Sequence, residues 1–354
     1  MKILNRYIGR NILVSIFAVM AVLLALFSFF QILDELGSVG KGRYDTGKAI
    51  MYVLMTLPTT AYQLLPITAL LGCTIGLGVL ANNSELTAIR SAGVSLEQII
   101  WSVLKAGLVV IIGGFVVGEW LAPMSEQKAQ TMRSVAKSSH LSLKGSQGLW
   151  AKDGTQYINV RAILPGRRLN NIYVYEVDHQ HHLTHILYAK SAFYRDDKWV
   201  LENVKHSYIV KGNVVAEHED KHVWNTTLSP DLLSIVTVKP NTLSIWGLYQ
   251  YVEYLDRNGL SADQYKQSLW TKATLPVVTV LMVLLSIPFV FGSMRTVSIG
   301  TRILVGALVG IGFHLLSQMF SYMGLVFDLN PAFSAMLPTL LAMLMVVLLL
   351  RRVH

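Results

Sequence analysis

Residues 12–33 read ILVSIFAVMAVLLALFSFFQIL, a run without one charged side chain. Five further stretches are almost as apolar, and each is long enough to cross the ~30 Å hydrocarbon layer of a bilayer as a helix. A soluble core helix of this length would keep a polar face, which these stretches lack. A membrane protein with six spans is therefore predicted: Ile12–Leu33, Ala49–Ala81, Ile99–Leu121, Ala273–Met294, Ile303–Phe327 and Pro331–Leu350.

Composition and charge agree with a membrane protein. The 354 residues are 53% hydrophobic and 14% charged, against about 25% charged in soluble domains. The net charge of +9 is not gathered into a basic stripe with exposed aromatics, which argues against a nucleic-acid partner. Basic residues favour cytoplasmic termini and a periplasmic central block. The inner ones are Lys2, Arg6, Arg10, Arg90, Arg295, Arg302, Arg351 and Arg352, and the outer ones are Lys41, Arg43 and Lys48.

The polar block between the third and fourth spans consists of short runs rich in Val, Ile, Tyr and Trp, separated by turn residues. This pattern predicts an antiparallel sandwich or roll inserted between two sets of three spans. The predicted domains are 1–123, 124–241 and 242–354. The predicted strands are Gly148–Asp153, Gln156–Ile163, Asn171–Val177, Leu183–Tyr194, Trp199–Val210 and His222–Thr227.

Three further features predict local structure. Pro58 and Pro66 interrupt the second stretch, so an outer non-spanning turn and a kink are expected there. Thr242–Arg257 has helical spacing and is expected to lie on the membrane surface. Glycines spaced four residues apart allow close helix packing, within the chain rather than between subunits. They are Gly72 and Gly76, Gly114 and Gly118, and Gly306 and Gly310.

The segment from Ser84 to Ser95 reads SELTAIRSAGVS and lies on the expected inner side. Ser84 is a good N-cap, Glu85 suits the first turn, and Gly93 can end a helix. A short exposed helix with a small apolar face could dock on a cytosolic ATPase, or lie among lipid headgroups. The residues assigned to ATPase coupling are Glu85, Leu86, Ile89, Arg90 and Gly93.

No catalytic or nucleotide-binding constellation can be assembled from the sequence. Gly42–Ala49 approaches a phosphate-binding loop, but it ends in Ala where Mg²⁺ needs Ser or Thr, and no strand precedes it. The histidines between Asp178 and His185 resemble a solvated hairpin tip more than a metal site. Glu119 is interpreted as an interfacial anchor. We therefore predict no enzyme activity, no cofactor and no metal for this chain.

Several of these segments resemble the lipopolysaccharide export permeases of the LptF/LptG family. They are Ser84–Ser95, Gly118–Pro123 and Gln147–Gly154, the last being most similar to the LptG branch. The resemblance extends from Arg6 to Arg352. It implies one half of an ABC exporter that extracts lipopolysaccharide from the inner membrane of a Gram-negative cell. ATP and Mg²⁺ would be held by a partner ATPase.

The resemblance also implies partners and a substrate path. The partners are an LptF-type permease, an LptB-type ATPase dimer and an LptC-type bitopic protein, and the β-domain would be a jelly roll. Lipid would enter through gates formed by spans one and five. The assigned path residues are Phe27, Phe30, Gln31, Asp34, Lys41, Arg43, Phe313, His314 and Gln318.

Two alternatives remain open from the sequence alone. The chain could be a static scaffold that presents a β-domain to other envelope proteins, or it could be the sister permease of the LptF branch.

Overall fold

The computed structural model describes residues 2–137, 148–164, 168–178, 180, 182–195, 198–210, 213–226, 228, 230, 240–291 and 297–351. Within these residues, six helices are long and apolar enough to cross a membrane, as predicted. Their α-helical segments are α1 (Lys2–Leu36), α2 (Thr46–Asn82), α4 (Leu96–Val116), α8 (Asp263–Phe291), α9 (Ile299–Val326) and α10 (Pro331–Arg351).

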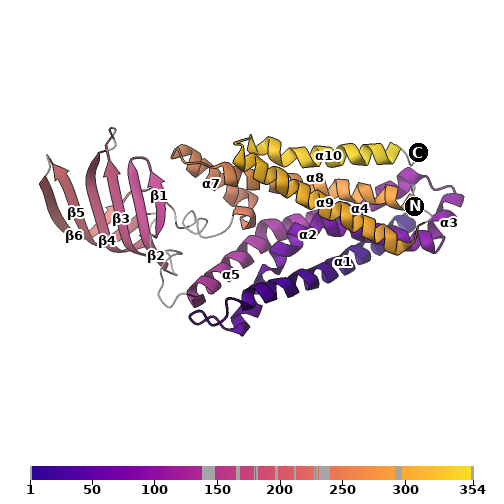
Figure 1. Cartoon of the computed structure of the whole chain (residues 1–354), viewed down its shortest axis with the longest axis horizontal. Coiled ribbons are helices and arrows are strands. Elements are labelled where there is room, and N and C mark those ends of the chain that lie inside the picture. The colour runs from indigo at the N-terminus through magenta and orange to yellow at the C-terminus, as the bar shows by residue number, and fades with distance from the viewer. Residues whose placement is uncertain are drawn as a thin grey trace.

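The molecule is elongated, with the helices bundled along its length and a β-sheet at one end (Figure 1). The first residues of α1 and the last residues of α10 lie at the opposite end of the bundle. The short helix α3 (Glu85–Ser91) also lies there. Among the described residues, the two chain ends and α3 thus lie together at one pole, as expected for one side of a membrane.

Helix α2 is the centre of the bundle and contacts α1, α4, α8 and α9. A Cβ atom on Gly72 would lie 2.4 Å from Ile16 Cα, and one on Gly310 would lie 2.6 Å from Ile67 Cγ1. Since real Cβ contacts are not this short, both glycines are required for helix packing inside the chain. The other four paired glycines also face residues of α1 or α2.

The second stretch, where an outer turn and a kink were predicted, forms one continuous helix, because α2 runs for 37 residues through Pro58 and Pro66. Threonine hydroxyls bond to carbonyl oxygens in the same helix, as from Thr60 to Thr56 and from Thr68 to Leu64. Neighbouring helices packed along a spanning helix let it keep internal prolines.

The third helix extends further than predicted. After α4 it passes through a π-helical turn, η1 (Val117–Leu121), and continues as α5 (Ala122–Lys137). The described β-structure begins only at Leu149. The polarity of residues 124–137 suggested the start of the β-domain, but these residues form a helix that extends from the bundle toward the sheet (Figure 1).

The sheet is a six-stranded antiparallel meander in the order β1 to β6. Neighbouring strands are joined by short connections, so each strand pairs with the next one along the chain. The predicted strands agree with the observed ones except the last. The strands are β1 (Leu149–Asp153), β2 (Gln156–Leu164), β3 (Arg168–Val177), β4 (Leu183–Arg195), β5 (Lys198–Val210) and β6 (Asn213–Trp224).

Strand β6 begins nine residues before the predicted 222–227 segment. Its sequence NVVAEHEDKHVW carries a charged run, and most of its residues are exposed. Charges along an exposed edge strand oppose pairing with another chain. Because of this charged run, the hydrophobic pattern of the sequence did not indicate most of strand β6.

Helix α7 (Ile245–Arg257), predicted to lie on the membrane surface, buries much of its apolar side against the sheet. Leu248, Tyr251, Tyr254 and Leu255 are buried in the same apolar cluster as the sheet core. Tyr254 Oη donates to the carbonyl oxygen of Lys152 in β1 at 2.8 Å. The helix is thus part of the β-domain and connects it to α8.

Candidate functional site

The end of the bundle far from the sheet, which the charge pattern predicts to be the inner pole, is formed by α3 and the ends of the spanning helices. Ser84 precedes α3 with a φ of 58°, and its side chain makes no capping hydrogen bond, contrary to prediction. Glu85 lies in the first turn. Gly93 follows the helix with a φ of 87°, a conformation that favours glycine.

The apolar and polar sides of α3 have different environments. Leu86 is 3% exposed, and Ile89 is partly buried against the same cluster of residues from the spanning helices. Thr87, Ala88 and Arg90 are exposed. The small apolar face therefore fixes α3 to its own chain, and a polar face is left for any partner.

Glu85 connects α3 to the first span. Tyr7 Oη donates to Glu85 Oε2 at 2.7 Å, across 78 residues of sequence. Asn83 Nδ2 also donates to the carboxylate, at 3.3 Å. Any force applied to α3 would reach the inner end of α1 directly through this bond.

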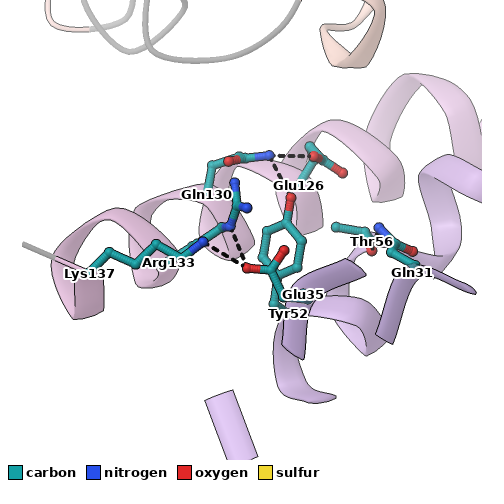
Figure 2. Close-up of polar contacts among 8 residues, drawn as sticks. All are labelled: Gln31, Glu35, Tyr52, Thr56, Glu126, Gln130, Arg133 and Lys137. Carbon is teal, nitrogen blue, oxygen red and sulfur yellow. Dashed lines mark hydrogen bonds and ion pairs between the residues drawn. The ribbon is translucent and has the colours of Figure 1, made fainter. Parts of the chain in front are cut away.

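At the opposite end of α1, a buried carboxylate binds two cations of α5 (Figure 2). Glu35 is 3% exposed, and its Oε1 lies 2.7 Å from Arg133 Nε and 2.9 Å from Lys137 Nζ. Burying an unpaired carboxylate would be costly, so the pairing holds α1 against α5. Burial raises the pKa of the adjacent Tyr44 above its usual range, with Glu35 adding to the effect.

A second layer of polar contacts extends this cluster across α2. Gln130 Nε2 donates to Tyr52 Oη at 2.9 Å and to Glu126 Oε1 at 3.0 Å. Gln31 Nε2 donates to Thr56 Oγ1 at 3.0 Å (Figure 2). Side chains of α1, α2 and α5 are therefore joined by a polar network at this end of the bundle.

The loop between α1 and α2 carries two of the assigned cations. Lys41 and Arg43 are exposed. Gly42 has a φ of 63°, and its Cα lies so close to α5 that a Cβ would sit 2.8 Å from the Ala136 carbonyl oxygen. The backbone N–H of Arg43 also donates to that oxygen, at 2.7 Å. The backbone of this loop is thus bonded to the end of α5.

The path residues predicted on α1 have mixed environments. Phe27, Phe30 and Asp34 are exposed, whereas Gln31 is bound to Thr56. In the most apolar segment of α1 only 11% is buried, whereas 67% of the corresponding segment of α2 is buried. The first span therefore offers a free apolar face.

Helix α9 offers a second exposed apolar face, since only 11% of its most apolar segment is buried. His314 and Gln318 are exposed and hydrogen bonded to each other at 3.1 Å, while Phe313 packs toward the bundle. Exposed apolar residues recur every three or four positions, which places them on one side of the helix. They are Leu304, Leu308, Ile311, Leu315, Met319, Tyr322 and Val326.

Glu119 caps α7. Its carboxylate accepts from the backbone N–H of Ile245 at 2.9 Å and of Trp246 at 3.2 Å. These donors lie at the start of α7, where a helix has no internal acceptors and attracts negative charge. Glu119 therefore joins the end of the third span to the β-domain.

Sequence reasoning missed Glu35, Arg133 and Lys137 as a group. The only available signal was a carboxylate at the end of a span, which is unusual unless it is paired. Its partners lie 98 and 102 residues away in sequence.

These features define a multi-pass membrane protein with an inserted β-domain, two free helix faces and a polar helix at the inner pole. The chain belongs to the family of lipopolysaccharide export system permeases LptF/LptG, whose family model matches residues 6–352. Members of this family are transmembrane subunits of an ABC transporter and are not themselves catalytic.

Relatives of the LptG type align over almost the whole chain. LptG of Haemophilus influenzae is 37% identical over 351 residues, 99% of this chain and 98% of the relative. LptG of Escherichia coli K12 is 33% identical over 340 residues, 95% of this chain and 94% of the relative. LptF of Escherichia coli K12 is 25% identical over 137 residues, 39% of this chain and 37% of the relative.

Proposed function

We propose that this chain is the LptG-type half of a lipopolysaccharide exporter and that it works beside an LptF-type permease. The observation that carries the assignment is the difference in alignment: 351 residues at 37% identity with an LptG protein, against 137 residues at 25% with an LptF protein. The chain resides in a bacterial inner membrane, with its termini in the cytoplasm and its sheet in the periplasm.

Two membrane-facing helices support the proposed substrate path. Helices α1 and α9 are the least buried spans, each with a face that this chain leaves uncovered. The partner permease covers them in the complex, and lipopolysaccharide enters between α1 of one half and α9 of the other. Its acyl chains contact Phe27, Phe30 and the exposed side of α9, which includes His314 and Gln318.

Cations at the outer end of α1 receive the lipid phosphates. Lys41 and Arg43 are exposed, and the loop that holds them is bonded to the end of α5. Charge-assisted hydrogen bonds to phosphate are strong and directional. A phosphate at this position also competes with Glu35 for Arg133 and Lys137, which loosens α1 from α5 as the lipid enters.

Helix α3 couples ATP binding by the ATPase to movement of the spanning helices. The LptB-type ATPase dimer, which holds ATP and Mg²⁺, contacts the exposed face of α3 formed by Thr87, Ala88 and Arg90. Leu86 and Ile89 transmit the displacement to the bundle, and the bond from Glu85 to Tyr7 transmits it to α1. An LptC-type protein joins the complex, and the six-stranded sheet receives the lipid.

A charge reversal tests the docking face. Arg90→Glu in the reconstituted complex is expected to lower ATPase copurification and lipopolysaccharide export at least tenfold, because it places a repulsive charge on the docking face. Arg10→Glu is the matched control, since Arg10 is also exposed at the inner pole but lies on α1. It should retain the ATPase.

A second variant separates docking from transmission. Tyr7→Phe removes only the hydroxyl that binds Glu85, so the ATPase should remain bound while lipid release per ATP falls. An Arg90→Glu protein that exports normally would refute the docking face. Recovery of the wild-type chain with envelope proteins but without an ATPase would favour the scaffold alternative.

A further inference from the structure

Three side chains on β5 and β6 converge in the β-domain, away from every contact described so far. His206, Glu219 and His222 each offer a ligand atom, and these atoms lie within 4.8 Å of one another. Glu219 Oε2 is 3.4 Å from His206 Nε2 and 3.0 Å from His222 Nδ1. Both imidazoles thus face the same carboxylate oxygen.

The grouping depends on a bend in the sheet. Along the strands, His206 pairs with Glu217, whereas His222 pairs with Leu201. On a flat strand these positions would be on the order of 16 Å apart, at about 3.3 Å per residue. Asn203 lies between them with a φ of 54°, and the rings of His206 and His222 are 5.1 Å apart. The bend brings the two histidines together.

Contacts from His206 to His185 and from His185 to Glu176 orient the His206 ring. Its Nδ1 lies 3.2 Å from His185 Nε2, and His185 Nδ1 lies 3.4 Å from Glu176 Oε2. If Glu176 accepts from His185, then His185 Nε2 is an acceptor and His206 must donate through Nδ1. In the neutral ring, His206 Nε2 then carries a lone pair.

That lone pair points at an anion. His206 Nε2 faces Glu219 Oε2 at 3.4 Å, and two acceptors at this distance repel unless positive charge lies between them. A cation bound from solution between these two atoms would supply that charge.

We propose that His206, Glu219 and His222 bind a late first-row divalent metal ion such as Zn²⁺. Nitrogen and carboxylate ligands at about 2.0–2.2 Å from Zn²⁺ place ligand atoms roughly 3.3–3.5 Å apart in a tetrahedral site, close to the two distances here. The fourth position opens to solvent, since the Glu219 side chain is 50% exposed and that of His222 is 35% exposed.

The arrangement also has the support that metal-binding histidines need. A ligating imidazole is normally oriented by a hydrogen bond from its other nitrogen, and His185 with Glu176 provides this for His206. A bound ion would link β5 to the exposed edge strand β6 and stabilise that edge. This proposal does not depend on the export function, so either can fail alone.

The test uses the full-length chain, purified in detergent with a tag that contains no histidine and stripped with a chelator. Zn²⁺ binding is measured by titration calorimetry and by metal analysis after dialysis, and Co²⁺ provides a spectroscopic probe of four-coordinate geometry. The expected result is one ion per chain. His222→Gln and Glu219→Gln should each weaken Zn²⁺ binding at least tenfold, and Glu176→Gln should weaken it about tenfold.

Matched controls are available on the same domain. His218 is an exposed histidine of β6 beside Asp220, and His182 lies in the β3–β4 hairpin beside Asp178. His218→Gln and His182→Gln should leave Zn²⁺ binding unchanged. The partly exposed His222 is a better target than the buried His206, whose replacement can disturb folding. Absence of stoichiometric binding, binding that survives His222→Gln, or loss with either control would overturn the proposal.

Discussion

Replacing Glu35 by Gln isolates the contact that holds the outer end of α1 to α5. The substitution keeps the size of the side chain and one acceptor oxygen, but removes the charge that binds Arg133 and Lys137. The neighbouring Asp34 is exposed on the same turn. Asp34→Asn is therefore a matched control that removes a carboxylate charge without touching the cluster.

The magnitude follows from burial. Removing one partner from a fully buried ion pair costs about 3–5 kcal/mol. Here the carboxylate is 3% exposed, but the side chains of Arg133 and Lys137 are 32% and 22% exposed, so water can replace part of the lost interaction. The amide also keeps one hydrogen bond. We expect Glu35→Gln to lower the free energy of unfolding by about 2 kcal/mol, within the range for hydrogen bonds to charged groups.

The assay is reversible unfolding in mixed micelles, followed by tryptophan fluorescence, with Glu35→Gln, Arg133→Gln and the double variant compared. Because the two residues touch, their effects should not add, and the interaction energy should be about 1–2 kcal/mol. Asp34→Asn should stay within about 0.5 kcal/mol of the wild type. Additive single effects, or equal losses for Glu35→Gln and Asp34→Asn, would refute the pairing.

Two further predictions concern helix packing. Gly72→Ala should lower the free energy of unfolding by about 1–3 kcal/mol, since the new Cβ would lie 2.4 Å from Ile16 Cα. Gly113→Ala, with open space around its Cβ position, is the control for the same unfolding assay. Glu119→Ala should raise amide hydrogen exchange at Ile245 and Trp246 about tenfold, because both N–H groups lose their acceptor. Mass spectrometry measures this exchange, and unchanged protection would contradict the cap.

Several local features of the fold were predictable because their causes are local. Five of the six strands were placed from alternating apolar residues and the turns between them. The exceptions have physical reasons. Strand β6 is an edge strand with charges on its surface, so its pattern does not resemble a half-buried strand. The prolines of α2 did not end the helix, because α1, α4, α8 and α9 pack along it.

The candidate site was predictable only in part. The α3 helix could be identified from its polar residues between two spans, but not the direction of its apolar side. Leu86 and Ile89 were assigned to a partner surface, and they pack against the chain's own bundle instead. Burial depends on which neighbour covers a residue, and a seven-residue helix carries no information about that.

The sequence by itself determined that six helices cross a membrane and that an antiparallel sheet separates two groups of three. A spanning segment must satisfy its backbone hydrogen bonds within itself and match the bilayer thickness, so its signature lies in about 20 consecutive residues. Only the tertiary structure decided which polar groups meet. Glu35 with Arg133, Tyr7 with Glu85 and His206 with His222 are brought together by helix packing and by a bend in the sheet. Those geometries arise from contacts between distant segments, so no local pattern in the chain could specify them.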